Sequence, residues 1–117
     1  MLILRTGWNC QAPYEWGQHV LIGRAAGLSD DTFALLCSDV PSPDTDPWDA
    51  LLITAADELH RDAGLSDATW SQLASRYDDR QLIEVPMVVG AYHQVSFVLN
   101  ALGVPLDEGI QGFAANR

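Results

Sequence analysis

A carboxylate and an imidazole lie four residues apart near the start of this sequence, at Glu15 and His19. On a helix, residues at this spacing share a face about one turn apart, so the two side chains would meet. A neighbouring carboxylate favours the charged imidazole and decides which ring nitrogen holds the proton, as general acid–base catalysis requires. A Glu–His pair at this spacing is also common on exposed helices, where it contributes little stability. The spacing alone leaves both interpretations open.

Five further residues are candidates for lining a substrate pocket around this pair: Tyr14, Trp16, Cys10, His93 and Arg5. Tyr14 and Trp16 suit a partly dry pocket, although large aromatics equally serve as core anchors. Cys10 would be reactive if its pKa were lowered, and is otherwise a small buried apolar residue. His93 would be a second proton-transfer group, or a histidine satisfied by a backbone carbonyl. Arg5 would hold a substrate carboxylate through two hydrogen bonds, or form a structural salt bridge.

The composition describes one globular domain that covers residues 1–117, with 48% hydrophobic and 19% charged residues. The net charge is −10, and all six basic residues are arginine. The absence of lysine excludes Schiff-base and lysine general-base mechanisms. Without a basic patch, nucleic acid and anionic membrane surfaces are poor partners.

The sequence carries no metal-binding or cofactor-binding motif, so we expect no metal and no cofactor. Its acidic residues cluster in turns, where they cap helices and keep the surface soluble. Two cysteines are too few for a disulfide scaffold, no apolar run is long enough to span a bilayer, and no basic leader segment is present. These features predict a reduced, cytoplasmic protein. His60 lies near an expected helix end, which explains it without a catalytic role.

The apolar residues recur at helical spacing along most of the chain, which predicts an all-α fold. Local start and stop signals predict helices over residues 14–26, 30–37, 47–63, 67–76 and 79–102. The expected caps at the helix starts are Ser29, Asp46, Ser66 and Asp78 or Asp79, and the expected stop signals are Gly27, Gly64 and Gly103. Pro86 is expected to bend or delay the last helix. The residues after that helix, 107–117, are expected to form a loose tail. The apolar surface of the last helix exceeds what its short neighbours can cover, so we expect a homo-oligomer.

Several stretches carry a family resemblance: Leu2-Ile3-Leu4-Arg5, Gly7-Trp8-Asn9-Cys10, Tyr14-Glu15-Trp16-Gly17-Gln18-His19, Ala56-Asp57-Glu58-Leu59 and Leu99-Asn100-Ala101-Leu102-Gly103-Val104-Pro105. Together they span nearly the whole chain, which resembles the carboxymuconolactone decarboxylase family, also called AhpD-like. The resemblance implies an all-α bundle of five to six helices that assembles as a trimer or hexamer.

Two activities are known in that family. Peroxidase-type members use a Cys-x-x-Cys pair followed four residues later by a histidine. His19 matches that histidine, but the cysteine positions hold Ala12 and Glu15, and Cys10 lies two residues before the first of them. An upstream glutamate of these relatives would fall before Met1, which leaves open whether residues precede Met1 and whether a neighbouring subunit completes the pocket.

Decarboxylase-type members carry Glu and His at the spacing of Glu15 and His19. The resemblance therefore implies cofactor-free acid–base chemistry on a small organic acid or lactone, of the decarboxylation type. Two alternatives stay open. One is AhpD-like thiol peroxidase activity through Cys10. The other is a ligand-binding or assembly module without catalysis.

Overall fold

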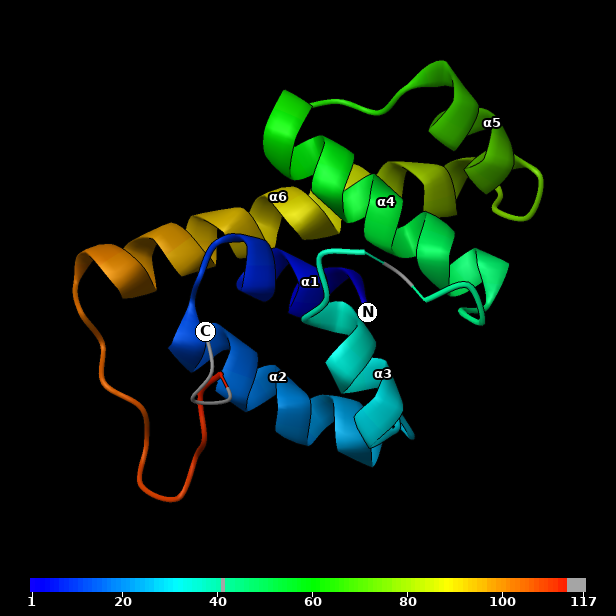
Figure 1. The fold of residues 1–117 in the computed structure, drawn as a ribbon. Coiled ribbons are helices and arrows are strands. Elements are labelled where there is room, and N and C mark those ends of the chain that lie inside the picture. The colour runs from blue at the N-terminus through cyan, green and yellow to red at the C-terminus, as the bar shows by residue number, and fades with distance from the viewer. Residues whose placement is uncertain (41, 114–117) are drawn as a thin grey trace.

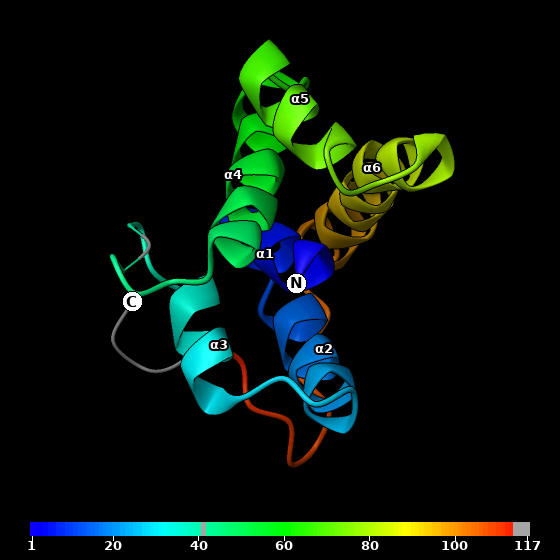
Figure 2. The same ribbon diagram turned by 90° about the vertical axis from the view of Figure 1, so that its right-hand side faces the viewer.

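The computed structural model describes residues 1–40 and 42–113, which form six helices and contain no strand. The helices are α1 (Leu2–Asn9), α2 (Pro13–Ala25), α3 (Asp30–Leu36), α4 (Pro47–Asp62), α5 (Asp67–Ala74) and α6 (Asp79–Ala101). Figures 1 and 2 show α1 in the middle, with α4, α5 and α6 on one side and α2 and α3 on the other. The predicted all-α fold is confirmed.

The central helix α1 was not predicted, because it has only eight residues and no recognisable start signal marks it. Its N-cap residue Met1 makes no side-chain capping bond. Eight residues are too few for apolar periodicity, which is judged over about 11–18 residues, to indicate a helix. The α1 residues from Leu4 through Trp8 are all buried. α1 packs against α2, α3, α4 and α6, and this contact with four helices explains the burial.

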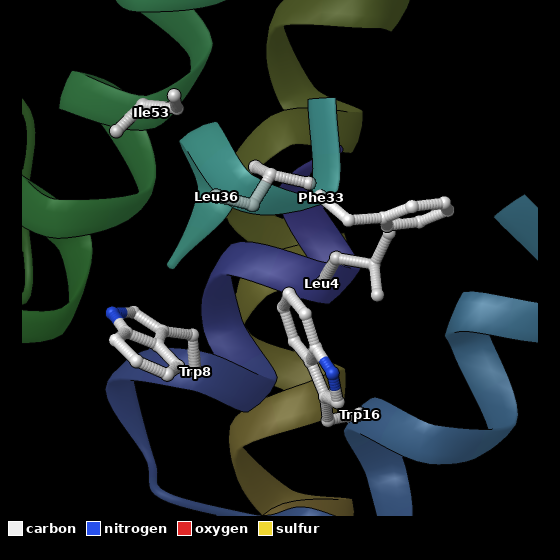
Figure 3. Packing of buried hydrophobic residues seen from close by; sticks show 6 residues of the cluster. All are labelled: Leu4, Trp8, Trp16, Phe33, Leu36 and Ile53. Carbon is white, nitrogen blue, oxygen red and sulfur yellow. The ribbon is translucent and has the colours of Figure 1, made fainter. Parts of the chain in front are cut away.

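Two groups of buried residues fill the space on either side of α1. One gathers side chains from α1, α2, α3 and α4, drawn in Figure 3: Leu4, Trp8, Trp16, Phe33, Leu36 and Ile53. The other joins α4, α5 and α6 through Leu51, Leu52, Ala55, Leu73, Leu82 and Val85. The first cluster fixes α1 and α2, which carry most of the candidate site residues, and the second packs against Met1 and Leu2 at the start of α1.

The predicted capping residues lie at the N-termini of the helices, where their side chains accept hydrogen bonds from backbone N–H groups of the first turn. Ser29 accepts the backbone N–H of Thr32 at 3.2 Å, and Asp78 forms a reciprocal capping box with Gln81. Two details differ from the prediction. α4 ends at Asp62, and its C-cap residue Ala63, rather than Gly64, takes the left-handed conformation (φ 54°). Pro86 lies inside α6 but does not delay its start at Asp79.

The expectation of a loose tail is wrong for residues 107–113, and residues 114–117 lie outside the described part. Figure 1 shows the segment after α6 looping back to α2. The Phe113 ring lies 5.2 Å from the ring of Trp8 and 5.5 Å from that of Trp16. At Gly17, an added Cβ would lie only 2.7 Å from the Gln111 carbonyl oxygen. The aromatic contacts and this close approach hold the segment against the domain.

α6 is long and apolar enough to cross a membrane by length and composition, which contradicts the prediction that no such run exists. This is weak evidence for a span, because helices of soluble proteins pass the same test. Only 22% of its most apolar window is buried within this chain. The exposed apolar residues of α6 include Ile83, Met87, Phe97 and Val98. The helix therefore presents an apolar surface that the other described helices leave uncovered.

Candidate functional site

The Glu15–His19 pair forms as predicted in the first half of α2. Pro13 occupies the first position of this helix, where its missing N–H costs nothing and its fixed φ suits a helix. Four residues apart, the two side chains meet, with His19 Nδ1 2.6 Å from Glu15 Oε1. The Glu15 residue is only 5% exposed, so the carboxylate is held away from bulk water.

The surroundings define which nitrogen of His19 is available for chemistry. Nδ1 also lies 3.2 Å from the main-chain carbonyl oxygen of Glu15. A carbonyl oxygen only accepts hydrogen bonds, so Nδ1 carries a proton and Nε2 of the neutral ring holds the lone pair. Within the described residues, Nε2 makes no hydrogen bond. The Tyr92 ring of α6 packs edge-on against the imidazole at 5.0 Å. The imidazole of His19 is therefore held in place at Nδ1, and Nε2 remains available for chemistry.

Burial raises the pKa of the Glu15 carboxyl above its usual range, and the charge of His19 pulls it back down. The charge states of the two groups are therefore linked, because a charged imidazole beside Glu15 stabilises the ionised form of this buried carboxyl. An acid and a base coupled in this way can pass a proton to a third molecule, as general acid–base catalysis requires.

The aromatic neighbours Tyr14 and Trp16 make their contacts elsewhere. The Tyr14 hydroxyl donates to Asp107 Oδ2 at 3.1 Å, on the surface. Trp16 is buried in the core against Trp8 and Phe113. In the part of the chain that the structure describes, no hydrogen bond or ring contact joins either residue to His19. Their contacts anchor the segment after α6.

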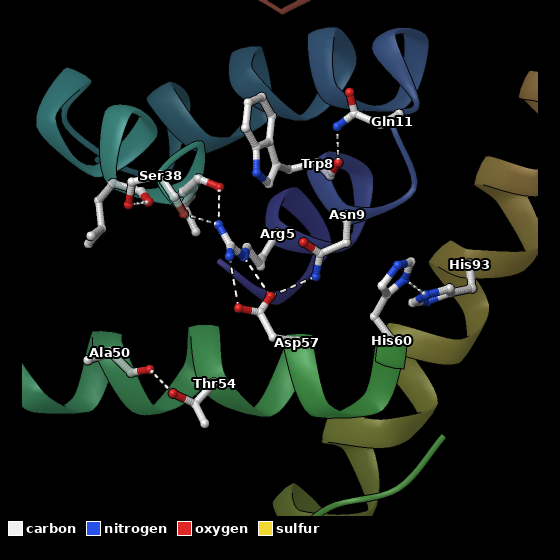
Figure 4. Close-up of polar contacts among 12 residues, drawn as sticks. Arg5, Trp8, Asn9, Gln11, Ser38, Ala50, Thr54, Asp57, His60 and His93 are labelled. Carbon is white, nitrogen blue, oxygen red and sulfur yellow. Dashed lines mark hydrogen bonds and ion pairs between the residues drawn. The ribbon is translucent and has the colours of Figure 1, made fainter. Parts of the chain in front are cut away.

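Arg5 is buried and fully engaged within the protein (Figure 4). Its Nε and Nη2 donate to the two carboxylate oxygens of Asp57 on α4, at 2.7 and 2.8 Å. Its Nη1 donates to the carbonyl oxygens of Leu36 and Ser38, at 2.9 and 2.8 Å. Asn9 completes the network by donating to Asp57 at 2.7 Å. These contacts tie α1, α3 and α4 together and favour the structural interpretation of Arg5 over substrate binding.

Cys10 and His93 lie together with His60, a residue for which the sequence predicts no catalytic role. Figure 4 shows the rings of His60 and His93 facing one another, with His60 Nδ1 2.8 Å from His93 Nε2. The Cys10 sulfur completes the group, in which the potential ligand atoms all lie within 4.8 Å of one another. The three residues come from α4, α6 and the end of α1, so no local motif could reveal them.

Two groups of this cluster, Cys10 and His60, favour their neutral forms. Burial raises the pKa of the Cys10 thiol, which the Ser96 hydroxyl partly offsets. Burial also lowers the pKa of His60, as does the neighbouring His93, while Asp57 opposes both effects. Cys10 is therefore mostly a thiol near neutral pH, without the raised thiolate fraction of a reactive cysteine.

A surface cavity of about 840 Å³ lies between α2, α3 and the segment after α6. Gly17, Val20 and Arg24 of α2 line it. These residues lie on the face of α2 opposite to Glu15 and His19, because successive helix residues are about 100° apart. The cavity is therefore not the pocket of the Glu15–His19 pair.

Comparison with solved structures identifies the architecture. The structure matches that of a protein of unknown function from Agrobacterium tumefaciens, described as a candidate antioxidant defence protein AhpD, with a TM-score of 0.81. The chain has an AhpD-like fold. The match covers 91% of this chain and 74% of the other, at 18% sequence identity. No protein-family model matches the sequence, and no curated protein matches it.

Proposed function

We propose that this protein is a carboxymuconolactone decarboxylase-like enzyme that performs cofactor-free acid–base chemistry on a small organic acid or lactone. The observation that carries the proposal is the Glu15–His19 pair, with Nδ1 2.6 Å from a buried carboxylate oxygen. The AhpD-like fold and the Glu-x-x-x-His spacing of decarboxylase-type relatives support the same assignment.

In the proposed reaction, the bond between the substrate carbon and its carboxylate breaks and carbon dioxide leaves. The electron pair moves into an electron sink of the substrate, such as a conjugated carbonyl, and gives an enol or enolate. Protonated His19 then delivers a proton from Nε2 to the carbon that lost the carboxylate. Glu15 holds Nδ1 and stabilises the imidazolium before the transfer. A largely dry surrounding would assist by weakening the hydration of the substrate carboxylate.

A thiol peroxidase is the weaker alternative. Ala12 and Glu15 stand where the redox cysteines of peroxidase-type relatives would be. Burial raises the pKa of the Cys10 thiol, which lowers the fraction of nucleophilic thiolate. The non-catalytic binding module predicts ligand-induced stabilisation without turnover.

The proposal includes assembly as a homo-oligomer, with a trimer or hexamer expected from the family resemblance. The exposed apolar residues of α6, among them Ile83 and Met87, would be buried between subunits. A neighbouring subunit would also close the pocket beside His19. We place the protein in the cytoplasm, where its two cysteines, which form no disulfide with each other, would stay reduced.

The experiment compares two assays on the same preparations. Carboxymuconolactone and related lactones and acids are followed by ultraviolet absorbance, and peroxide reduction is followed with a dithiol donor. We expect lactone or acid turnover by the wild type, strong loss in His19→Ala and Glu15→Gln, and full activity in Cys37→Ser as a matched control. Peroxide turnover that disappears in Cys10→Ser, without any decarboxylation, would replace our proposal with the redox alternative. Binding without turnover in either assay would favour the non-catalytic module.

A further inference from the structure

The group of Cys10, His60 and His93 combines the side chains that bind zinc-like ions. Thiolate sulfur and imidazole nitrogen are the preferred ligands of Zn²⁺ and similar borderline-soft divalent ions. The three potential ligand atoms, Cys10 Sγ and one nitrogen of each histidine, lie within 4.8 Å of one another. Around a tetrahedral zinc ion, bond lengths of 2.0–2.3 Å would put such atoms about 3.3 to 3.6 Å apart. The observed cluster is thus close to the required size.

Hydrogen bonding prepares His93 to act as a ligand. Its Nδ1 lies 2.8 Å from the carbonyl oxygen of Val89, which only accepts, so Nδ1 carries the proton and Nε2 holds a lone pair. A second hydrogen bond of this kind orients most metal-binding histidines and fixes their tautomer. The lone pair on Nε2 points to His60 Nδ1, 2.8 Å away.

The lone pair on Nε2 of His93 also explains the contact between His60 and His93. His60 Nδ1 must donate its proton to His93 Nε2, so one proton now lies between the rings. A divalent ion can replace that proton if the two nitrogens separate by about half an ångström. His60 is exposed at the end of α4, so its ring can turn and carry its proton on Nε2, facing water. The exposure also leaves the fourth coordination position open to solvent.

A hydrogen bond that holds Cys10 in place and the negative charge of the protein both favour the binding of a cation by this cluster. The Cys10 carbonyl oxygen accepts a hydrogen bond from Asn100 Nδ2 at 2.9 Å, which ties the end of α1 to α6. Asp57 lies near enough to His60 to favour its charged form, and would favour a metal ion there in the same way. The protein carries a net charge of −10, which attracts divalent cations.

We propose that Cys10 Sγ, His60 Nδ1 and His93 Nε2 form a three-ligand site for Zn²⁺ or a similar divalent transition-metal ion, with water as the fourth ligand. Binding releases the thiol proton of Cys10 and the shared proton of His60. The site shares no residue with the Glu15–His19 pair, so it stands or falls independently of the proposed function. It would join α1, α4 and α6 at a point where the sequence shows no metal motif.

The test uses Co²⁺ as a spectroscopic probe for the zinc site, because a cobalt–thiolate bond gives a near-ultraviolet charge-transfer band that reports the sulfur ligand directly. We expect one Co²⁺ per chain with this band, and its disappearance when Zn²⁺ is added. The band should be absent in Cys10→Ser. Affinity should fall at least about tenfold in His60→Gln and His93→Gln.

The remaining cysteine and histidine of the chain provide matched controls. Cys37→Ser and His19→Gln should bind Co²⁺ like the wild type. His60 is exposed, so His60→Gln remains informative even if Cys10→Ser is unfolded by circular dichroism. The proposal is overturned if the wild type shows no charge-transfer band, if the band depends on Cys37, or if cobalt binding is unchanged in folded His60→Gln. The last result would indicate adventitious binding to surface carboxylates.

Discussion

The Arg5 network gives a stability prediction that separates a structural arginine from a substrate-binding one. The Arg5→Met substitution keeps the aliphatic stem but removes the guanidinium. Asp57 is then left with Asn9 as its hydrogen-bond donor, and the Leu36 and Ser38 carbonyl oxygens lose their bonds to Arg5. Removing one partner of a buried ion pair costs about 3–5 kcal/mol. The Asp57 side chain is 33% exposed, so water replaces part of the lost contact. We therefore expect a loss of about 3 to 4 kcal/mol, near the lower end of this range.

The assay is urea unfolding followed by far-ultraviolet circular dichroism, at one fixed protein concentration because assembly would contribute to stability. Arg24→Met is the matched control, since Arg24 pairs with Asp30 on the surface, where both side chains are mostly exposed. It should cost less than about 1 kcal/mol. If Arg5→Met also costs less than about 1 kcal/mol and instead raises KM for an acidic substrate, the structural interpretation of Arg5 is wrong.

Three further predictions concern other parts of the molecule. Gly17→Ala should displace residues 107–113, because the Cβ of the new alanine would lie 2.7 Å from the Gln111 carbonyl oxygen. We expect faster proteolysis of this segment, while the helical circular dichroism signal is kept. Burial raises the pKa of Glu15 in the folded state above its value in the unfolded chain, so protonation of Glu15 favours folding. This contribution to the free energy of unfolding is lost as pH rises through the raised pKa. Stability should therefore decline with pH across this window in the wild type, and Glu15→Gln should flatten the decline in urea titrations. A stable mass of 12.8 kDa for the wild type by light scattering would refute assembly through α6. We instead expect a multiple of that mass, reduced by the double substitution Ile83→Asp and Met87→Asp.

The sequence predicted the elements whose signals are local. Ser29, Asp46 and Ser66 cap helices where expected, because a side-chain oxygen can reach the first free backbone N–H groups without help from the rest of the fold. The spacing of Glu15 and His19 likewise sufficed, since four residues on one helix fix their proximity. Local geometry determined both features.

The features that could not be predicted from the sequence depend on contacts between residues far apart in the chain. α1 has only eight residues, too few for periodicity to indicate a helix, and its burial comes from contacts with α2, α3, α4 and α6. Phe113 looked like part of a tail because its partners, Trp8 and Trp16, lie far away in the sequence. His60 and His93 meet only because α4 and α6 pack together. Such features follow from the tertiary fold and have no signature in spacing.

The most direct test of the central claim is the turnover of carboxymuconolactone by the wild type and by His19→Ala, followed by ultraviolet absorbance. Removing a positioned general acid or base typically costs about 10²–10⁴-fold in rate. We predict measurable turnover by the wild type and a loss of this size in His19→Ala, with the fold kept by circular dichroism. Equal turnover by the two proteins, or none by the wild type, would contradict the assignment of Glu15 and His19 to decarboxylation of this substrate.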